Sequence, residues 1–254
     1  MHNKRRCVSS AFLDHSTYYN TFRKGISMSR IQDYDGVIFD MDGVIFDSER
    51  ASIRCWLDVC RPYGISDQDI WDVKLQTTGT TVVNSRRVFT ERFGHLPGFD
   101  YTPLRALYEE RYNELLAMGE IPVKRGAGAL LEWLRAQGKK VGLASSTNTE
   151  KVLRLLCLAN LEHLFDNIIG GDQVMHSKPD PEIYRMSMQR LGLDPARTYG
   201  IEDSYNGIRS LHEAGIHPVM VPDMLPETDE MRSLADAVFP DLEAVLNAFR
   251  NAGR

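Results

Sequence analysis

The chain has 254 residues, of which 43% are hydrophobic and 26% charged, values that are typical of a globular protein and exclude a disordered, fibrous or disulfide-stapled one. The length suits one large domain or two smaller ones. After the first 30 residues, the chain holds 24 basic and 34 acidic side chains, a net charge of −10. Because nucleic acid and anionic membranes are bound by clustered cations, we expect neither as a partner.

The first 30 residues differ from the rest of the chain. They hold six basic residues and one acidic residue, and no apolar period is sustained along them. We expect a basic N-terminal extension (1–30) without fixed structure, either a disordered tail or the product of an upstream start; a transit peptide is the less favoured reading. The four cysteines lack metal-binding spacing, and no apolar run is long enough to cross a bilayer. We therefore expect a cytoplasmic protein, either a monomer or a weak oligomer.

Short apolar runs alternate with amphipathic stretches along most of the chain. Such runs are typical of buried parallel strands, and the stretches between them are typical of helices. The alternation predicts an α/β fold with a doubly wound parallel sheet. The predicted strands are 36–39, 140–144, 168–170, 199–201 and 218–221, and the predicted core helices are 127–137, 182–191 and 206–214.

Residues 49–120 interrupt this alternation. Three helical patterns, at 52–60, 81–93 and 103–118, follow one another without a strand between them. We expect a helical insert at 49–120, while 31–48 and 121–254 form the core. The Pro- and Gly-bearing stretch 121–126 suits a hinge. Asp47 and Ser48 are predicted to cap the first helix of the insert.

Polar residues follow four of the predicted strands. Because ligands of an open parallel sheet bind beyond the carboxyl ends of its strands, we expect these residues to share one crevice. Carboxylates gathered there repel one another unless a hard cation such as Mg²⁺ neutralises them. The residues are Asp40, Asp42 and Gly43 after the first strand, Ser145, Ser146 and Thr147 after the second, Lys178 after the third, and Glu202 and Asp203 after the fourth.

This combination of acids, hydroxyls and a lysine indicates phosphoryl transfer. Asp40 is placed to attack phosphorus, since carboxylates form covalent aspartyl-phosphates. Asp42 is placed to act as general acid and then as general base, and Gly43 permits the turn between them. Lys178 and Ser145 supply donors for the phosphoryl oxygens, with backbone N–H groups near Ser146.

The same residues resemble the motifs of a known family. Asp40-Met41-Asp42-Gly43-Val44-Ile45-Phe46-Asp47-Ser48-Glu49 is similar to the first motif of the haloacid dehalogenase superfamily. Ser145, Lys178 with Pro179, and Glu202-Asp203-Ser204 match the second, third and fourth motifs in order. The resemblance covers about residues 31–250. It implies a Rossmann-like core with a helical cap between the first two motifs, as in the β-phosphoglucomutase and small sugar-phosphatase branch.

The resemblance also implies roles for single residues. Asp40 would be the nucleophile and Asp42 the acid and base, while Ser145 and Lys178 would hold the phosphoryl group. The Mg²⁺ ligands would be the Asp40 carboxylate, the Asp42 backbone carbonyl and Asp203. Glu202 would be a second carboxylate near the metal. Since true dehalogenases lack the second acid of the first motif, Asp42 favours hydrolysis of phosphate esters.

The substrate is the least constrained part of the prediction. Thr80 and Thr81, beside Gly79, are the specificity candidates in the insert. Mutases of this branch carry an arginine shortly after such a glycine, whereas residues 80–83 contain none. We therefore expect an Mg²⁺-dependent phosphatase acting on a small phosphorylated metabolite, a sugar phosphate above all. The alternatives are a β-phosphoglucomutase-like phosphomutase and a non-catalytic regulator that binds a phosphorylated ligand.

Overall fold

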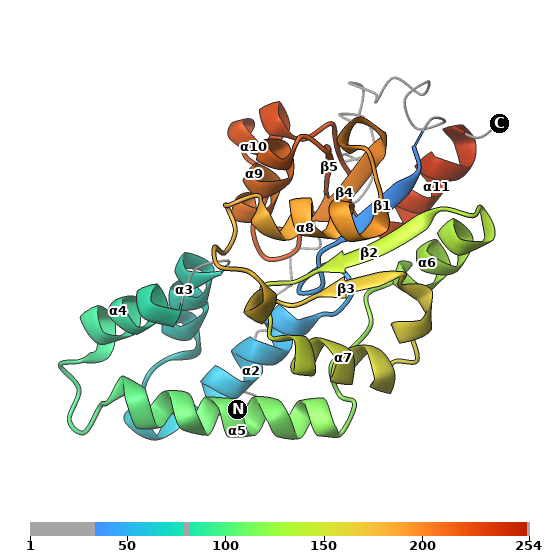
Figure 1. Ribbon diagram of the computed structural model, residues 1–254. Coiled ribbons are helices and arrows are strands. Elements are labelled where there is room, and N and C mark those ends of the chain that lie inside the picture. Colours follow the sequence, from blue (N-terminus) through green and yellow to red (C-terminus); the bar gives the residue numbers. More distant parts are fainter. Residues whose placement is uncertain (1–33, 79–81, 253–254) are drawn as a thin grey trace, which may run out of the picture.

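The computed structural model describes residues 34–78 and 82–252 (Figure 1). The predicted extension at 1–30, together with Thr80 and Thr81, lies outside the described residues. Among the helices that are described, none combines the length and the apolar character that a membrane span requires.

A parallel sheet of six strands forms the centre of the fold, as the alternating pattern predicted. Its strand order is β3-β2-β1-β4-β5-β6, so the chain winds outward from β1 in both directions. The five predicted strands are all present, and the short β6 was not predicted. The strands are β1 Gly36–Phe39, β2 Lys140–Ala144, β3 Asn167–Ile169, β4 Thr198–Glu202, β5 His217–Met220 and β6 Ala237–Val238.

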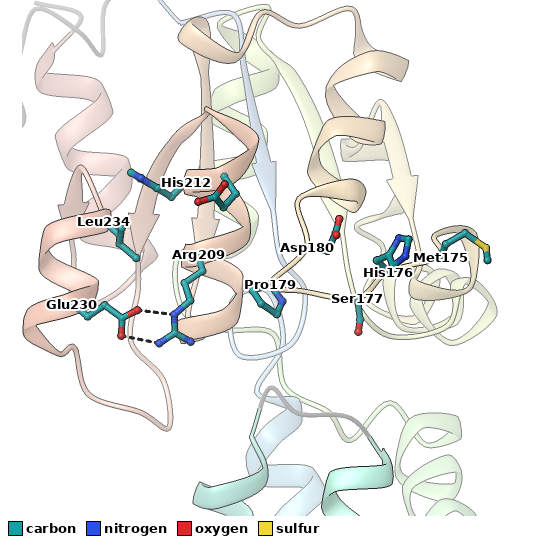
Figure 2. Close-up of a pocket in the computed structure, with 10 residues that line it drawn as sticks. Met175, His176, Ser177, Pro179, Asp180, Arg209, His212, Glu230 and Leu234 are labelled. Carbon is teal, nitrogen blue, oxygen red and sulfur yellow. Dashed lines mark hydrogen bonds and ion pairs between the residues drawn. The ribbon is translucent and has the colours of Figure 1, made fainter.

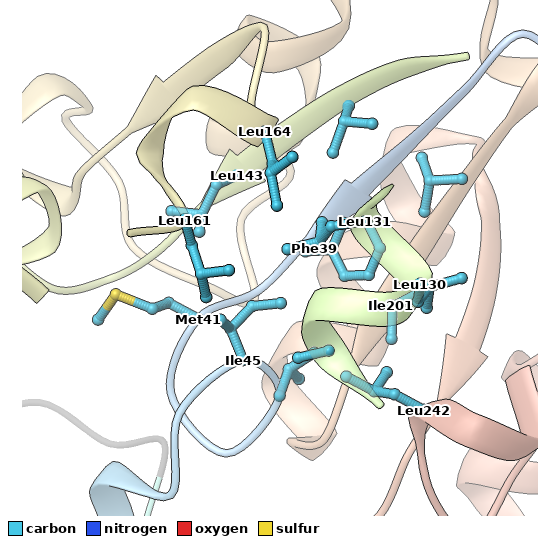
Figure 3. Close-up of a cluster of buried hydrophobic side chains, with 14 of the residues drawn as sticks. Phe39, Met41, Ile45, Leu130, Leu131, Leu143, Leu161, Leu164, Ile201 and Leu242 are labelled. Carbon is cyan, nitrogen blue, oxygen red and sulfur yellow. The ribbon is translucent and has the colours of Figure 1, made fainter. Parts of the chain in front are cut away.

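Helices cover both faces of the sheet, because side chains of a strand point alternately to opposite sides. Val37 and Phe39 of β1 pack with α6, α7 and α11, whereas Ile38 packs with α8, α9 and α10. Figure 3 shows the first of these layers, where Phe39 lies among Leu130, Leu131 and neighbouring side chains. The core helices are α6 Ala127–Ala136, α7 Thr149–Leu158, α8 Glu182–Leu191, α9 Tyr205–Ala214, α10 Asp229–Leu234 and α11 Leu242–Ala252.

The helical insert, named here for the segment from α2 to α5, has an apolar core of its own. Trp56 is buried in it and packs against Phe89 and Tyr108 with ring centroids 4.3 and 4.5 Å apart. The predicted insert helices are present, and α3 is an additional one. The helices are α2 Ser48–Cys60, α3 Asp67–Thr77, α4 Val82–Phe93 and α5 Tyr101–Ala117.

Two linkers join the insert to the core and pair with each other. Phe46 and Val123 form an antiparallel bridge, and the N–H of Asp47 donates to the carbonyl of Pro122 at 2.9 Å. The linkers therefore run side by side from the carboxyl end of β1, which places the insert over that edge of the sheet (Figure 1).

Asp47 occupies the N-cap position of α2 and Ser48 is the first residue of the helix, but the side-chain cap that was predicted there is absent. The Asp47 side chain makes no capping hydrogen bond and instead accepts from Arg50 at 2.8 Å. Arg50 and Lys124 both donate to one oxygen of Asp223, each at 2.6 Å. The Asp223 side chain is 1% exposed, so a buried carboxylate after β5 ties the start of α2 and the second linker to the core.

Candidate active site

The carboxyl ends of the strands bring together residues that lie far apart in the sequence. Asp40, Glu202 and Asp203 are all buried, and one carboxylate oxygen from each lies within 4.8 Å of the others. Lys178, whose side chain is 6% exposed, donates to Asp40 at 2.5 Å and to Glu202 at 2.7 Å. Its third proton reaches the carbonyl of Ala144 at 3.0 Å. Lys178 is thus fixed by three acceptors between two acids.

The charges of this cluster determine how its members ionise. Burial by itself lowers the pKa of Lys178, but the carboxylates of Asp40 and Glu202 raise it well above its ordinary value. The ammonium group therefore stays charged. Burial raises the pKa of Asp40, and so do the negative charges of Glu202 and Asp42, against the opposing effect of Lys178. Several acids share one lysine, which leaves negative charge uncompensated.

Glu202 uses both of its oxygens for contacts within the protein. Burial raises its pKa, but Lys178 and the hydrogen bonds of Ser204 and Tyr184 outweigh burial and lower it. The carboxylate thus holds Lys178 and the start of α9 in place. Its donors are the Lys178 ammonium, the Tyr184 hydroxyl, the Asp203 N–H, and the N–H and hydroxyl of Ser204.

Asp203 is the acid of the cluster whose charge is least compensated. Asp203 is 5% exposed, and no donor among residues 34–78 and 82–252 forms a hydrogen bond to its carboxylate. Burial raises its pKa well above the ordinary value, and the charges of Glu202 and Asp40 raise it further. Carboxylate oxygens are the ligands that Mg²⁺ prefers, so Asp40 and Asp203 fit a divalent cation between them.

Gly43 allows the first-strand loop to approach Asp203. Its φ is +77°, in the left-handed region that favours glycine. A Cβ placed on Gly43 would lie 2.2 Å from Oδ2 of Asp203, closer than two such atoms can approach. Glycine is therefore required here for two independent reasons, its backbone conformation and the space that Asp203 occupies.

The substitution Gly43→Ala separates these two reasons when it is compared with Gly138→Ala. Gly138 has a φ of +68°, and a Cβ there would meet nothing within 4 Å, so we expect Gly138→Ala to cost about 1 kcal/mol of unfolding free energy. We expect Gly43→Ala to cost about 2 kcal/mol or more, because Asp203 must also move. Denaturant unfolding measures both values, and equal losses would show that the contact with Asp203 is unimportant.

The loop after β2 holds Asp42. The Asp42 carboxylate accepts from the hydroxyl of Thr147 at 2.8 Å and from that of Ser145 at 3.3 Å. The N–H of Thr147 in turn donates to the Ser145 hydroxyl at 3.0 Å. Ser146 is exposed and lines the cavity beside them. The sequence placed Ser145 and Ser146 here, but it gave no role to Thr147, which follows the same strand.

A cavity of about 470 Å³ lies between this cluster and the insert. The core contributes Asp40, Asp42, Lys178 and Asp203 to its walls. The insert contributes mainly hydroxyl groups and paired charges. The hydroxyl-bearing residues of the insert are Ser48, Ser52, Thr77, Thr78, Ser85, Tyr108 and Tyr112.

A second hollow, of about 850 Å³, lies on the other side of the Lys178 loop (Figure 2). Ser177 and Pro179 line it, but neither Asp40 nor Asp203 does. Its Arg209 pairs with both oxygens of Glu230 at 2.7 Å, so this cation is already neutralised. Its larger volume does not make it the reactive site, because chemistry depends on the groups present and not on the space.

Comparison with known proteins agrees with this geometry. Residues 37–221 match the family described as haloacid dehalogenase-like hydrolase. Protein CbbY of Cereibacter sphaeroides is 26% identical over 226 residues, which cover 86% of this chain and 94% of CbbY.

Two further proteins are similar to this chain. A phosphorylated carbohydrates phosphatase of Thermotoga maritima is 36% identical over 118 residues, which is 45% of this chain and 52% of that relative, about half of each. The crystal structure of a HAD family hydrolase from Deinococcus radiodurans R1, which holds phosphate and sodium, has a TM-score of 0.74 and 25% identity. That likeness covers 87% of this chain and 97% of the other.

Proposed function

Because the chain belongs to the haloacid dehalogenase-like hydrolase family, we propose that it is an Mg²⁺-dependent phosphatase that hydrolyses a small sugar phosphate through an aspartyl-phosphate on Asp40. The observation that carries this proposal is the contact of Asp40 with Lys178 at 2.5 Å, beside Asp203 and beneath one polar cavity. The phosphatase named among the similar proteins supports the same reaction.

The reaction proceeds in two displacements. An oxygen of Asp40 attacks phosphorus and the bond from phosphorus to the sugar oxygen breaks, while Asp42 gives its proton to that oxygen. Water then attacks the aspartyl-phosphate, Asp42 takes the proton of the water, and the bond to Asp40 breaks to release phosphate. Lys178 and Ser145 hold the phosphoryl oxygens throughout. Because Thr147 and Ser145 fix the Asp42 carboxylate, its place relative to Asp40 is set before the substrate arrives.

Mg²⁺ would be held by the carboxylates of Asp40 and Asp203 together with the backbone carbonyl of Asp42. When bound, it neutralises negative charge on the phosphoryl group. Glu202 stands within the same cluster, but both of its oxygens accept protein hydrogen bonds. We therefore assign Glu202 the role of positioning Lys178. The carboxylates of Asp40 and Asp203 then remain as the side-chain ligands of the metal.

The walls of the cavity favour a small molecule that bears several hydroxyl groups. Seven residues of the insert that line the cavity carry hydroxyls, and the apolar contribution is small, with Val82 and Leu155 its aliphatic members. A sugar or sugar alcohol would exchange hydrogen bonds with such walls, whereas a large apolar ester would leave them unpaired.

The mutase alternative requires a cation to hold a second phosphate. Arg86 lies over the ring of Tyr101 at 5.7 Å, and Arg87 pairs with Glu91 on the surface of α4. Among the described residues, each cation that the insert and α7 offer to the cavity already has a carboxylate partner. These pairs are Lys74 with Glu49, Arg105 with Glu109, and Lys151 with Glu109. Hydrolysis of a monophosphate suits these walls better.

A phosphate-release screen tests the proposal directly. The panel comprises sugar phosphates, nucleotides and a chromogenic ester, each with and without Mg²⁺. We expect Mg²⁺-dependent release that is fastest with a sugar monophosphate. Glucose 1-phosphate with a bisphosphate primer identifies the mutase, because glucose 6-phosphate would then form in place of free phosphate. If neither product forms on any substrate, the non-catalytic regulator becomes the better reading.

Removal of metal has a predicted effect on stability as well as on activity. We expect chelation to abolish phosphate release and added Mg²⁺ to restore it. Mg²⁺ at a hundredfold excess over its dissociation constant should stabilise the fold by about 2.7 kcal/mol, seen as a rise in Tm without substrate. Asp203→Asn should lose that rise, whereas Asp229→Asn, at a fully exposed carboxylate, should keep it. An undiminished rise in Asp203→Asn would remove Asp203 from the metal site.

A further inference from the structure

The insert meets the core at two places on opposite sides of the cavity. At the first, beside the paired linkers, Asp223 of the core binds Arg50 at the start of α2 and Lys124 of the second linker, as described above. At the second, α5 of the insert approaches α7 of the core (Figure 1). Away from the linkers, one ion pair among the described residues crosses from insert to core. The Lys151 ammonium of α7 donates to Oε2 of Glu109 in α5 at 2.7 Å, and both residues line the cavity.

Glu109 is held in position from its own side. Arg105, one helical turn earlier in α5, donates to the other oxygen of Glu109. The guanidinium of Arg105 lies 4.7 Å from the ring centroid of Tyr108, which is hydrogen-bonded to Ser52 at 2.8 Å. The aromatic core of the insert therefore fixes Arg105, and Arg105 fixes Glu109. Only Lys151 must be brought from the other domain.

The charge on Glu109 is maintained by these same partners. Burial raises the pKa of its carboxyl, but the hydrogen bond from Lys151 and the charges of Arg105 and Lys151 outweigh burial and lower it. The side chains of Glu109 and Lys151 are 31% and 38% exposed. They are therefore accessible enough to separate when α5 moves away from α7, and shielded enough to attract each other when it returns.

We propose that Glu109 and Lys151 are positioning residues that hold the insert closed over Asp40. The inference rests on the proposed function, in which the insert must open for substrate and close to exclude water. Lys151 lies in the first turn of α7, and the loop before that helix carries Thr147, which holds Asp42. Formation of the Glu109–Lys151 pair thus brings α5 of the insert toward the loop that orients Asp42, the general acid and base.

A double-mutant cycle tests the pair. Glu109→Gln and Lys151→Gln should each lower kcat/KM about three- to fivefold, in the range measured for partly exposed ion pairs, and the double variant should lose no more than either single one. Raising the salt concentration should lower kcat/KM of the wild type more steeply than that of either variant, since salt screens the Glu109–Lys151 attraction in addition to the attraction for the anionic substrate. Glu114→Gln, at an exposed pair with Arg111 on the same helix, is the matched control and should keep wild-type activity.

Each other result overturns the proposal. Losses that multiply in the double variant would mean that the two residues act independently. A lower kcat/KM in Lys151→Gln with an unchanged value in Glu109→Gln would mean that Lys151 contacts the substrate. Small-angle scattering separates this test from the proposed function, because it needs no activity: Glu109→Gln and Lys151→Gln should enlarge the radius of gyration and Glu114→Gln should not. Unchanged scattering in all three would exclude the closing role even if the protein is a phosphatase.

Discussion

Asp40→Asn should abolish phosphate release, with a loss on the order of 10⁴-fold or more, while the protein stays folded. The amide has the size of the carboxylate, and its oxygen can still accept from Lys178, so the packing around this buried position is preserved. The amide cannot, however, attack phosphorus and form the covalent intermediate. Phosphate release and near-ultraviolet circular dichroism, measured on the same preparation, check the two halves of this prediction.

The control for this substitution is Asp67→Asn. Asp67 lies exposed in the first turn of α3, outside the cavity, so loss of its charge should leave turnover unchanged. Ordinary activity in Asp40→Asn would remove Asp40 as the nucleophile. A loss of the circular dichroism signal would instead show that the charge of Asp40 is needed for folding, and the kinetic result would then carry no information about the nucleophile.

The position of the site could be predicted from the sequence because it depends on topology more than on side-chain detail. Short apolar runs identify parallel strands, and the ends of such strands must meet at one edge. Asp40, Lys178 and Asp203 were predicted together on that ground, and the structure brings them together. The family inferred from the four motifs is confirmed by the match over residues 37–221.

The helix of the insert that was missed, α3, carries a weak local signal. Four charged side chains interrupt the apolar period of α3, and only Ile70, Val73 and Thr77 are buried along it. The helix is stabilised by packing against α2 and α4, which no local pattern reports. The caps at Asp47 and Ser48 failed for a related reason, since Arg50 competes for the Asp47 carboxylate.

The partners within the site were the least predictable part. Asp223 follows a strand, so the strand-end rule already used for Asp40 could have found it, whereas Thr147 was placed by that rule without a role. Tyr184, which binds Glu202, and Glu109, which binds Lys151, lie within helices, and tertiary packing brings each of them to its partner. No spacing along the chain specifies such contacts.

The second large effect is expected at Lys178. Lys178→Met should lower the unfolding free energy by about 3–5 kcal/mol, since it leaves Asp40 and Glu202 buried without their cation. It should also lower turnover on the order of 10³-fold, because the donor to the phosphoryl oxygens is lost. Lys140→Met, at an exposed lysine at the start of β2, is the matched control and should stay within about 0.5 kcal/mol of the wild type.

The pH dependence of stability gives this prediction a definite sign. In the wild type the folded pKa of Glu202 is lowered, so its contribution is present above the ordinary value of 4.5 and is lost as pH falls through the folded pKa. Without Lys178, the buried carboxylates prefer to be protonated, and their folded pKa values move upward. The stability deficit of Lys178→Met should then shrink as the pH is lowered from 7 to 5. A deficit that does not change with pH would mean that lost packing, and not unpaired charge, destabilises the variant.

A second substitution separates the structural and catalytic roles of Lys178. Glu202→Gln in the Lys178→Met background removes one of the unpaired charges. Its amide oxygen can still accept from the N–H groups of Asp203 and Ser204, while its NH2 group can donate to the Tyr184 hydroxyl. Because removing both partners of a buried ion pair costs less than removing one, the double variant should recover part of the lost stability. Turnover should not recover, since no cation then faces the phosphoryl oxygens. Recovery of both stability and turnover would mean that Lys178 serves only to neutralise Glu202. Recovery of neither quantity would mean that the attraction between Lys178 and Asp40 dominates the cluster.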